Sequence, residues 1–284
     1  MAVFFNQATL TYNGGVANSN IVSGEIVGVI TATKTATPST YGQDGTVTYV
    51  VTLFNSGTTA VTDLTVSDDL GAYTLDTLTL VPLDYVEGSV RYFADGVLQP
   101  APTVGSTSPL TITGISVPAG GSSAIVYQTE ANSFAPLEVG GTITNTASVS
   151  GGGIVEPVTA SATVTAADGA ALSITKSVSP TTVSDNGVLT YTFVISNNGN
   201  TPANATDNIV VSDSFNPILT GLTASLNGTA LTAGTDYTYN EGTGLFSTTA
   251  GLITVPAATY TQDPATGVIS VTPGTATLVV SGTV

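Results

Sequence analysis

Short runs of alternating apolar and polar residues dominate the sequence. Segment 47–53 reads Val-Thr-Tyr-Val-Val-Thr-Leu, and segment 189–195 reads Leu-Thr-Tyr-Thr-Phe-Val-Ile. This alternation places successive side chains on opposite faces, so each run predicts a half-buried β-strand. Gly, Asn and Pro separate the runs, and Asp95-Gly96 and Asn227-Gly228 are signals for tight hairpins. Many short strands at this spacing predict an all-β protein made of two-sheet sandwiches.

The chain contains an internal repeat. Each copy starts with a Lys-x-x-x-Pro segment and continues through a Thr-Tyr strand, an Asn-x-Gly turn and a Val-Ser-Asp segment. The first residues of these matched segments are Lys34 and Lys176, Thr48 and Thr190, Asn55 and Asn197, and Val66 and Val211. The shared order and nearly constant spacing indicate two copies of one module.

The repeat predicts four segments. Residues 1–30 are expected to form an N-terminal donor strand and linker, and residues 31–152 module one. A Gly/Ala/Thr-rich linker is predicted at 153–171, and module two at 172–284. We expect each module to be an immunoglobulin-like (Ig-like) β-sandwich with its own core.

Module two is predicted to lack its closing strand. Module one closes with Asn145–Ser150, whereas the end of module two matches only earlier runs, with Ile269–Val271 corresponding to Ile115–Val117. A run similar to the missing one, Asn6–Thr11, stands at the front of the chain. Because an unpaired sheet edge templates pairing with another strand, we predict strand addition. Residues 3–12 would complete module two of a neighbouring subunit.

The sequence leaves two outcomes of that pairing open. Within one chain, residues 1–12 would fold back onto module two and give a closed monomer. Between chains the contact is heterologous, and its repetition produces a head-to-tail filament. The intervening module would hold the two ends apart, which favours the filament. Four donor-strand residues are expected to pack into the open core: Phe4, Phe5, Ala8 and Leu10.

The composition excludes several classes of function. The 284 residues include no Cys, His or Trp, and only 3 Lys and Arg against 19 Asp and Glu. The chain therefore offers no imidazole base, thiolate nucleophile, zinc site or disulfide, and we expect no cofactor. A net charge of −16 argues against nucleic acid and against an anionic membrane surface. The acidity is expected to favour solubility, since no EF-hand-type calcium loop occurs. The expected partner is a second copy of the chain.

Two of the three basic residues occupy equivalent positions in the two modules. Lys34 begins module one and Lys176 begins module two, while Asn145 and Asn6 are equivalent within the closing run. A buried Lys amine facing an Asn carboxamide can form an isopeptide bond, provided that a carboxylic acid with a raised pKa assists proton transfer. The first candidates for the acid are Asp68 and Asp213, and further possible acids are Glu25, Glu130 and Glu138.

These positions predict two isopeptide bonds. Lys34 and Asn145 would form an internal bond in module one, assisted by Asp68. Lys176 would join Asn6 of the neighbouring subunit, assisted by Asp213. The alternatives are ordinary structural roles: a surface charge or edge-strand protector for each Lys, a cap or turn for each Asn, and a turn for each Asp.

The motifs resemble a known family. The ordered set Lys-x-x-x-Pro, Thr-Tyr, Asn-x-Gly, Val-Ser-Asp and Asn-Thr-Ala-Ser-Val is similar to the conserved-repeat Ig-like domain of bacterial surface proteins. The resemblance covers both modules and implies an extracellular, wall- or fibre-associated protein. Met1–Gln7 has neither the basic nor the apolar segment of a secretory signal. We therefore expect either that a signal has been removed or that the protein reaches the outside without classical secretion. In this respect the chain is similar to subunits of clostridial endospore appendages, which are released when the mother cell lyses.

The predicted function is structural: a subunit of an extracellular bacterial fibre or spore appendage, located at a cell or endospore surface. The isopeptide bonds would be similar in kind to those of Gram-positive pilin and adhesin domains, except that module two lacks its own closing Asn. The main alternative is a surface adhesin or stalk that binds a ligand without polymerising. An enzyme such as a glycosidase would need two carboxylates placed together, and the sequence indicates no such pair.

Overall fold

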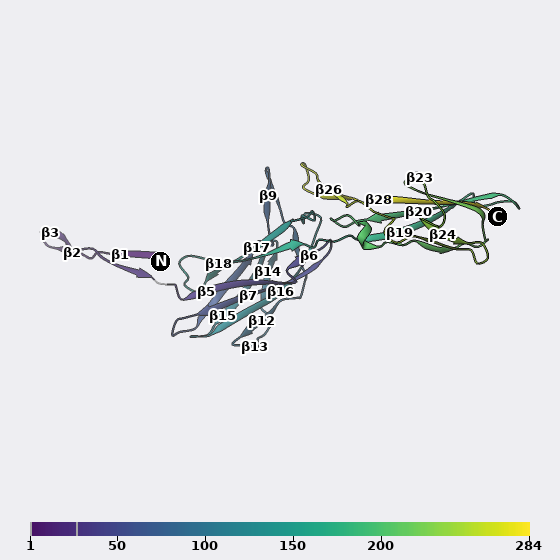
Figure 1. Ribbon diagram of the computed structural model, residues 1–284. Coiled ribbons are helices and arrows are strands. Elements are labelled where there is room, and N and C mark those ends of the chain that lie inside the picture. The colour runs from purple at the N-terminus through teal and green to yellow at the C-terminus, as the bar shows by residue number, and fades with distance from the viewer. Residues whose placement is uncertain (1, 27) are drawn as a thin grey trace. The chain divides into compact units, whose positions relative to one another are not determined.

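The computed structural model describes residues 2–26 and 28–284, which fall into two compact units (Figure 1). One unit contains the residues up to 136 together with 141–166 and 264–268. The other contains 137–140, 167–263 and 269–284. The described structure is almost entirely β, with one short 3-10 helix η1 (Ala205–Asp207). Each unit is described separately below.

Module one is a sandwich of two six-stranded sheets. The first sheet has the order β13-β12-β16-β7-β5, with β11 beside β16. Its strands are β5 (Ile30–Thr37), β7 (Thr46–Asn55), β11 (Leu83–Tyr85), β12 (Arg91–Ala94), β13 (Val97–Leu98) and β16 (Ser122–Ala131). The second sheet has the order β14-β15-β8-β17-β18-β6. Its strands are β6 (Thr40–Tyr41), β8 (Val61–Asp68), β14 (Thr103–Thr107), β15 (Leu110–Val117), β17 (Thr142–Gly151) and β18 (Val158–Ala166). A small hairpin joins β9 (Tyr73–Leu75) to β10 (Leu78–Leu80).

The alternation read from the sequence builds the core of module one. In β7, four residues two positions apart are fully buried: Val47, Tyr49, Val51 and Leu53. The same period in β17 buries Ile143, Asn145, Ala147 and Val149. The two sheets thus bring their apolar faces together, as the strand period requires.

Module two has one large sheet and several small ones. The large sheet has the order β19-β20-β28-β22-β23. Its strands are β19 (Leu172–Ser179), β20 (Val188–Asn197), β22 (Thr220–Leu226), β23 (Thr229–Ala230) and β28 (Gly274–Thr283). A three-stranded sheet has the order β21-β25-β24, with β21 (Ser212–Ser214), β24 (Tyr237–Asn240) and β25 (Leu245–Thr248). The remaining hairpin pairs β26 (Thr259–Gln262) with β27 (Ile269–Thr272).

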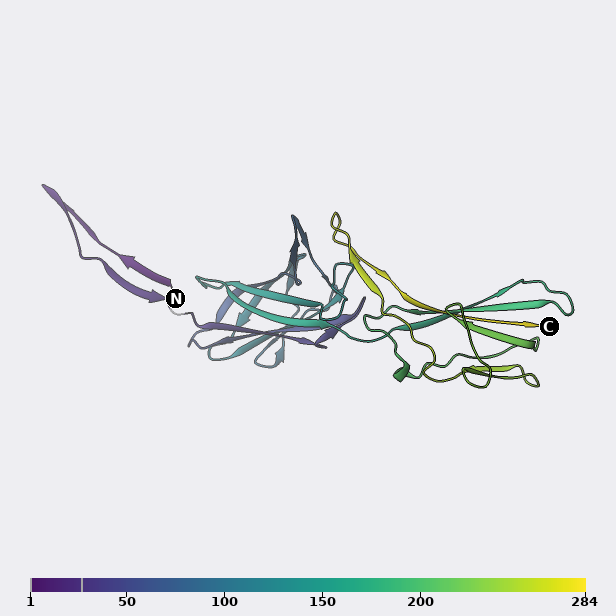
Figure 2. The same cartoon turned by 45° about the horizontal axis from the view of Figure 1, so that its top comes forward.

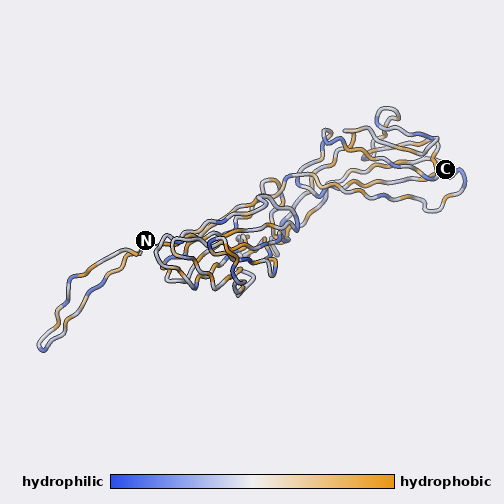
Figure 3. Tube along the Cα trace, turned by 90° about the horizontal axis from the view of Figure 1, so that it is seen from below, coloured by the Kyte–Doolittle hydropathy of each residue, from blue (hydrophilic) through white to orange (hydrophobic). Residues whose placement is uncertain are grey.

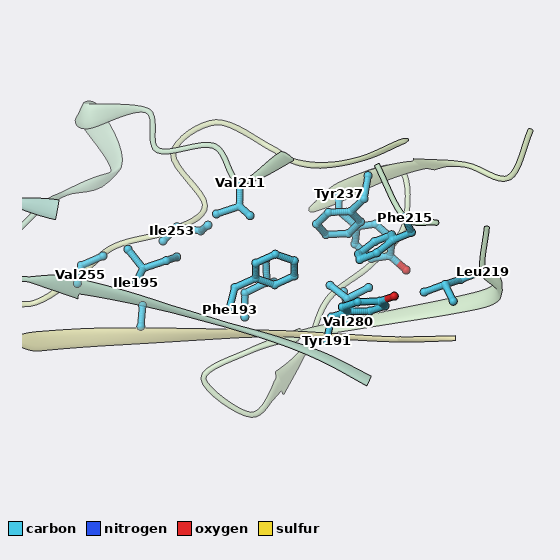
Figure 4. Packing of buried hydrophobic residues seen from close by; sticks show 14 of the residues in the cluster. Tyr191, Phe193, Ile195, Val211, Phe215, Leu219, Tyr237, Ile253, Val255 and Val280 are labelled. Carbon is cyan, nitrogen blue, oxygen red and sulfur yellow. The ribbon is translucent and has the colours of Figure 1, made fainter. Parts of the chain in front are cut away.

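The core of module two lies between these sheets (Figure 4). Phe193 and Ile195 of β20 face Val211, Ile253 and Val255 in this cluster. Aromatic rings fill the other end of the core, where the Phe215 ring centroid lies 4.8 Å from that of Tyr191 and 6.0 Å from that of Phe246.

The fold class predicted from the sequence is confirmed: the chain is all-β and sandwich-like. Both predicted hairpin turns are also present. Asp95 and Gly96 connect β12 to β13, and Asn227 and Gly228 connect β22 to β23. All four residues have positive φ, as the primed two-residue hairpin turns require.

The structure corrects the predicted linker at 153–171. Residues 158–166 form strand β18, which pairs with β17 along its length and belongs to module one. Ala160 and Ala162 are small residues of the kind that is common in linkers. In β18, however, they alternate with polar residues and face inward. Small side chains fit here because β18 lies close against β5.

Ile269–Val271 is also not equivalent to Ile115–Val117. The latter segment belongs to β15, which pairs with β8, whereas β27 pairs with β26. The strand of module two that takes the place of β15 beside β21 is β25. The equivalence between Ile269–Val271 and Ile115–Val117 predicted from the sequence is therefore wrong, because Ile269–Val271 lies in an additional hairpin of module two.

The N-terminal residues form an arm of two paired strands rather than one strand (Figure 2). Strand β1 (Ala2–Asn6) pairs with β4 (Val22–Ile26), and β2 (Thr9–Tyr12) pairs with β3 (Gly15–Asn18). A backbone hydrogen bond from Ser19 to Ala8 connects the two pairs. Residues 2–26 are called the arm below. We call β1 and β2 together its first strand, and β3 and β4 together its second strand. Of the predicted segment 1–30, Met1 and Val27 lie outside the described residues.

We predict that Ile143→Ala destabilises module one by about 2–5 kcal/mol, because it removes buried methyl groups and leaves a cavity. Thr144→Ala is the matched control, since Thr144 is the exposed neighbour in the same strand. Urea denaturation followed by tyrosine fluorescence measures both changes. Equal midpoints for the two variants would contradict the assigned faces of β17.

Candidate functional site

The lysine of module one lies inside the sandwich. The alternation of β5 turns Lys34 to the same face as the buried Ile30. Its Nζ atom lies 2.6 Å from Oδ2 of Asp68, at the end of β8, and both side chains are 0% exposed. The sequence-predicted pair of Lys34 and Asp68 is therefore brought together as a buried ion pair.

Asp68 is held by several donors. Its Oδ2 atom accepts hydrogen bonds from Lys34 and from the Tyr127 hydroxyl, and its Oδ1 atom accepts one of 3.0 Å from the backbone N–H of Leu70. Burial lowers the pKa of the Lys34 amine, while the charge of Asp68 opposes that effect. Burial raises the pKa of the Tyr127 hydroxyl well above its usual value, and Asp68 adds to the rise. These donors stabilise a charge that would otherwise be costly in an apolar core.

Asn145 enters the same core from the sheet that also carries Asp68, opposite the sheet of Lys34. It lies on β17, is fully buried and faces inward among apolar residues. Its carboxamide lowers the pKa of the Tyr49 and Tyr127 hydroxyls. Burial raises both pKa values by more than the carboxamide lowers them. Yet neither its nitrogen nor its oxygen meets a partner at hydrogen-bond geometry within the described structure. Leaving a buried amide unpaired costs about 1–3 kcal/mol, so this Asn is not a simple core residue.

Two stacked tyrosines frame the group. The ring centroids of Tyr49 and Tyr127 are 5.8 Å apart, and Lys34 Nζ lies 4.8 Å and 6.0 Å from them. The sequence motifs include Tyr49, in the Thr-Tyr strand, but they do not single out Tyr127. A strand pattern shows that such residues face inward, but it does not show which side chain on another strand they meet. The contact between Tyr127 and Asp68 is therefore visible only in the fold.

Module two repeats this centre in an open form. Lys176 and Asp213 form an ion pair, but their side chains are 41% and 18% exposed. Lys176 Nζ lies 4.7 Å from the ring centroid of Tyr191 and 5.3 Å from that of Phe215. The position of Tyr127 is occupied by Val280, which pairs with Tyr191 as Tyr127 pairs with Tyr49. The described residues 172–284 contain no counterpart of β17, and hence no Asn facing Lys176.

Because the described residues of module two include no counterpart of β17 and β18, the apolar face of β19 is exposed. In module one, β18 packs against β5, whose inward residues are buried or half-buried. In module two, every residue of β19 is exposed, including Leu172 at 43%, Ile174 at 53% and Val178 at 37%. Strand β21 pairs with β25 on one side, and no described strand lies on its other side. We call this surface, formed by the inward side of β19 and the free edge of β21, the open face.

Hydrophobic residues recur along both sides of the arm (Figure 3). Alternation along β1 places Phe4 and Asn6 on one side, and the same two-residue spacing continues to Ala8 and to Leu10 in β2. We call the side carrying these four residues the inner face. Phe5 lies on the opposite side, so it cannot enter the same groove as Phe4. Phe4, Phe5 and Leu10 are all exposed in the single chain. Asn6 is the polar residue between Phe4 and Ala8, just as Asn145 lies between Ile143 and Ala147.

Two of the three further predicted acids do not join either centre. Glu130 and Glu138 are exposed, and the side chain of Glu25 lies outside the described residues. Among the described residues, no group of three or more carboxylates is arranged to hold a metal ion. No described helix is long and apolar enough to cross a bilayer.

Comparison with known proteins gives only distant similarities. No protein-family model matches the chain, and no curated protein matches it. BcpA, the major pilin subunit of Bacillus cereus, is 12% identical with a TM-score of 0.34, over 96% of this chain and 73% of BcpA. A fragment of the major pilin GBS80 of Streptococcus agalactiae is 13% identical with a TM-score of 0.31, over 51% and 58% of the two chains.

The collagen adhesin of S. aureus is 14% identical with a TM-score of 0.27, over 55% of each chain. Enzymes also occur among the matches. At this level the comparisons do not discriminate between functions, and the function has to be argued from the site itself.

We predict that the two lysines differ in their effect on stability. Lys34→Met leaves the fully buried Asp68 unpaired and is expected to cost about 3–5 kcal/mol. Lys176→Met removes an exposed pair and is expected to cost at most about 1 kcal/mol. Urea denaturation of the monomeric variants measures both free energies. Similar losses in the two variants would show that the open and closed centres do not differ as described.

Proposed function

We propose that this chain is the structural subunit of an extracellular fibre, polymerising head to tail by donor-strand complementation. The observation that carries the proposal is the match between two unsatisfied surfaces. Module two has an open face where module one has β17, and the arm presents an inner face with the residue pattern of β17. Insertion of the arm of one subunit into module two of the next would satisfy both surfaces.

The geometry of this contact favours a filament. Donor and acceptor are different surfaces of the same chain, so the contact is heterologous, and each added subunit presents a new open face. The acidic, Lys-poor composition suits a soluble, exposed assembly. The sequence resemblance to bacterial surface repeats supports a location at a cell or endospore surface. The role is non-enzymatic, apart from the self-directed chemistry described next.

We further propose that isopeptide bonds seal the fibre. In module one, the neutral Lys34 Nζ attacks Cγ of Asn145, the Nζ–Cγ bond forms, and the Cγ–Nδ2 bond breaks. The nitrogen of Asn145 leaves as ammonia after it accepts a proton. Asp68, which accepts a hydrogen bond from Lys34 Nζ, would receive a proton from Lys34 and transfer one to the leaving group, and burial favours the neutral amine. The reaction needs no oxidant and no cofactor.

The same chemistry would join subunits at module two, with Lys176, Asp213 and the incoming Asn6. In the free subunit, the Lys176 side chain remains partly exposed to solvent, and no Asn carboxamide of the described residues faces it. Insertion of the arm would remove that solvent and deliver the carboxamide in one step. The bond would therefore form after docking rather than before it.

Assembly tests the donor strand through a matched pair of substitutions. Ala8 corresponds to the fully buried Ala147, and Thr9 corresponds to the half-buried Ser148 that points away from the core. We expect Ala8→Glu to abolish filaments in negative-stain electron microscopy, because it would bury a charge. Thr9→Glu is expected to leave filaments intact. Equal assembly of both variants would refute insertion of this strand.

The covalent seal is tested separately. We expect wild-type filaments to resist boiling in detergent, and Asn6→Ala filaments to form but dissociate to monomers. Intact mass adds a second measurement: wild-type monomer should lack the mass of one ammonia, and Lys34→Met monomer should regain it. Lys176→Met monomer serves as the control and should still lack one ammonia. A wild-type monomer of full mass would disprove the bond in module one.

A further inference from the structure

We propose that the donor is the complete arm, and that its second strand fills the place of β18 over β19 of a second copy of the chain. This inference rests on the proposed head-to-tail assembly and specifies its interface. The expectation from the sequence was a single inserted strand. The structure instead assigns two strands to the gap, because module one closes the equivalent surface with a hairpin of β17 and β18.

The first argument is what module two lacks. A single donor strand would pair with β21 as β17 pairs with β8, and it would leave β19 uncovered. In module one, β18 covers β5 and also pairs in parallel with β6. The segment equivalent to β6, residues 182–183, forms no strand in module two. Two separate features of module two, the exposed β19 and the unformed strand at 182–183, are thus explained by the absence of one element.

The second argument is the internal pairing of the arm. Asn6 pairs with Val22 as Asn145 pairs with Ala162. In both hairpins, then, the Asn stands beside a small or branched apolar residue on the neighbouring strand. The arm therefore presents its Asn in the setting that module one uses to place Asn145 in its core.

A neighbouring cross-strand pair shows that the arm fits the same space. Phe4 pairs with Gly24 where module one pairs Ile143 with Val164. The Phe4 ring covers Gly24 so closely that an added Cβ would lie 2.6 Å from it. A large and a small residue in the arm thus replace two medium-sized residues in module one. The two pairs have the same number of side-chain carbons, so each places a comparable apolar group at this position.

The third argument is the solvation of the arm. An isolated two-stranded hairpin is marginally stable in water, and this one exposes apolar residues on both strands. Leu10 of the first strand is 65% exposed, and Val22 of the second is 53% exposed. Val22 lies on the inner face because it pairs with Asn6, and Leu10 is one of the residues that define this face. A donor that inserted only its first strand would leave Val22 in water.

The equivalence fixes a register that can be tested. Ser148 lies opposite Ser67 in module one, which places Thr9 opposite Ser212 of the next subunit. Thr165 lies opposite Thr40, which places Glu25 opposite Thr182. Thr165 and Thr40 are exposed, so cysteines at the equivalent positions would point away from the core.

The native chain contains no Cys, so engineered pairs can be read without background. We would test Thr9→Cys with Ser212→Cys for the first strand, and Glu25→Cys with Thr182→Cys for the second. Thr9→Cys with Thr182→Cys is the mismatched control. Each variant also carries Asn6→Ala so that disulfides are the only covalent links, and electron microscopy confirms assembly before mild oxidation and non-reducing electrophoresis.

The inference predicts ladders of disulfide-linked oligomers for both matched pairs and none for the control. A ladder for the first pair alone would mean that only one strand inserts, which overturns this inference and leaves the proposed fibre intact. Absence of both ladders in assembled filaments, or cross-links confined to monomers, would overturn the proposed function as well.

A second pair of substitutions needs no cysteine. Val22→Glu changes the inner face of the second strand, and Ser23→Glu changes its opposite face. If the whole arm inserts, Val22→Glu abolishes filaments and Ser23→Glu does not. Normal assembly of both variants would overturn the inference, because a single-strand donor leaves both residues outside the joint.

Discussion

The interaction on which this structure depends is the covering of one sheet edge and one apolar strand face in each module. In module one, the hairpin of β17 and β18 pairs with β8 and packs over β5, and the core is closed. Residues 172–284 contain no such hairpin, so β21 has a free edge and β19 is exposed. An exposed edge beside apolar side chains favours pairing with another chain, and the arm at the other end of this chain has the matching pattern.

The two lysine centres differ in whether the β17–β18 hairpin covers them, so comparing them shows the effect of that hairpin. Lys34 and Asp68 are completely buried, among donors that hold the carboxylate and beside an unpaired Asn carboxamide. Lys176 and Asp213 keep the ion pair but remain partly in water. Both centres contain one Lys and one Asp, but the two pairs differ in exposure because one module has the β17–β18 hairpin and the other does not. In the proposed assembly, the second centre gains its Asn and its cover only when the arm of a neighbouring subunit docks.

Much of this account could be predicted from the sequence, because the repeat pairs each functional residue with an equivalent. Matching positions identified Lys34, Asp68 and Asn145 without any knowledge of the fold. The second missing strand was not recognised, since the Ala- and Thr-rich run at 158–166 has the composition of a linker and its weak alternation gains meaning only against β5. The two strands of the arm, by contrast, carry a local signal, because Asn13-Gly14 between β2 and β3 is a typical hairpin dipeptide. The hydrogen bond from Tyr127 to Asp68 joins two sheets, and strand patterns carry no information about such contacts.

Electron cryomicroscopy of assembled wild-type filaments tests the central claim most directly, because it shows what occupies the open face of module two. The account predicts density for two strands of the neighbouring subunit, one beside β21 and one over β19, with Asn6 next to Lys176. A joint in which residues 2–26 lie outside module two, or in which the open face is closed by residues of the same chain, would contradict it.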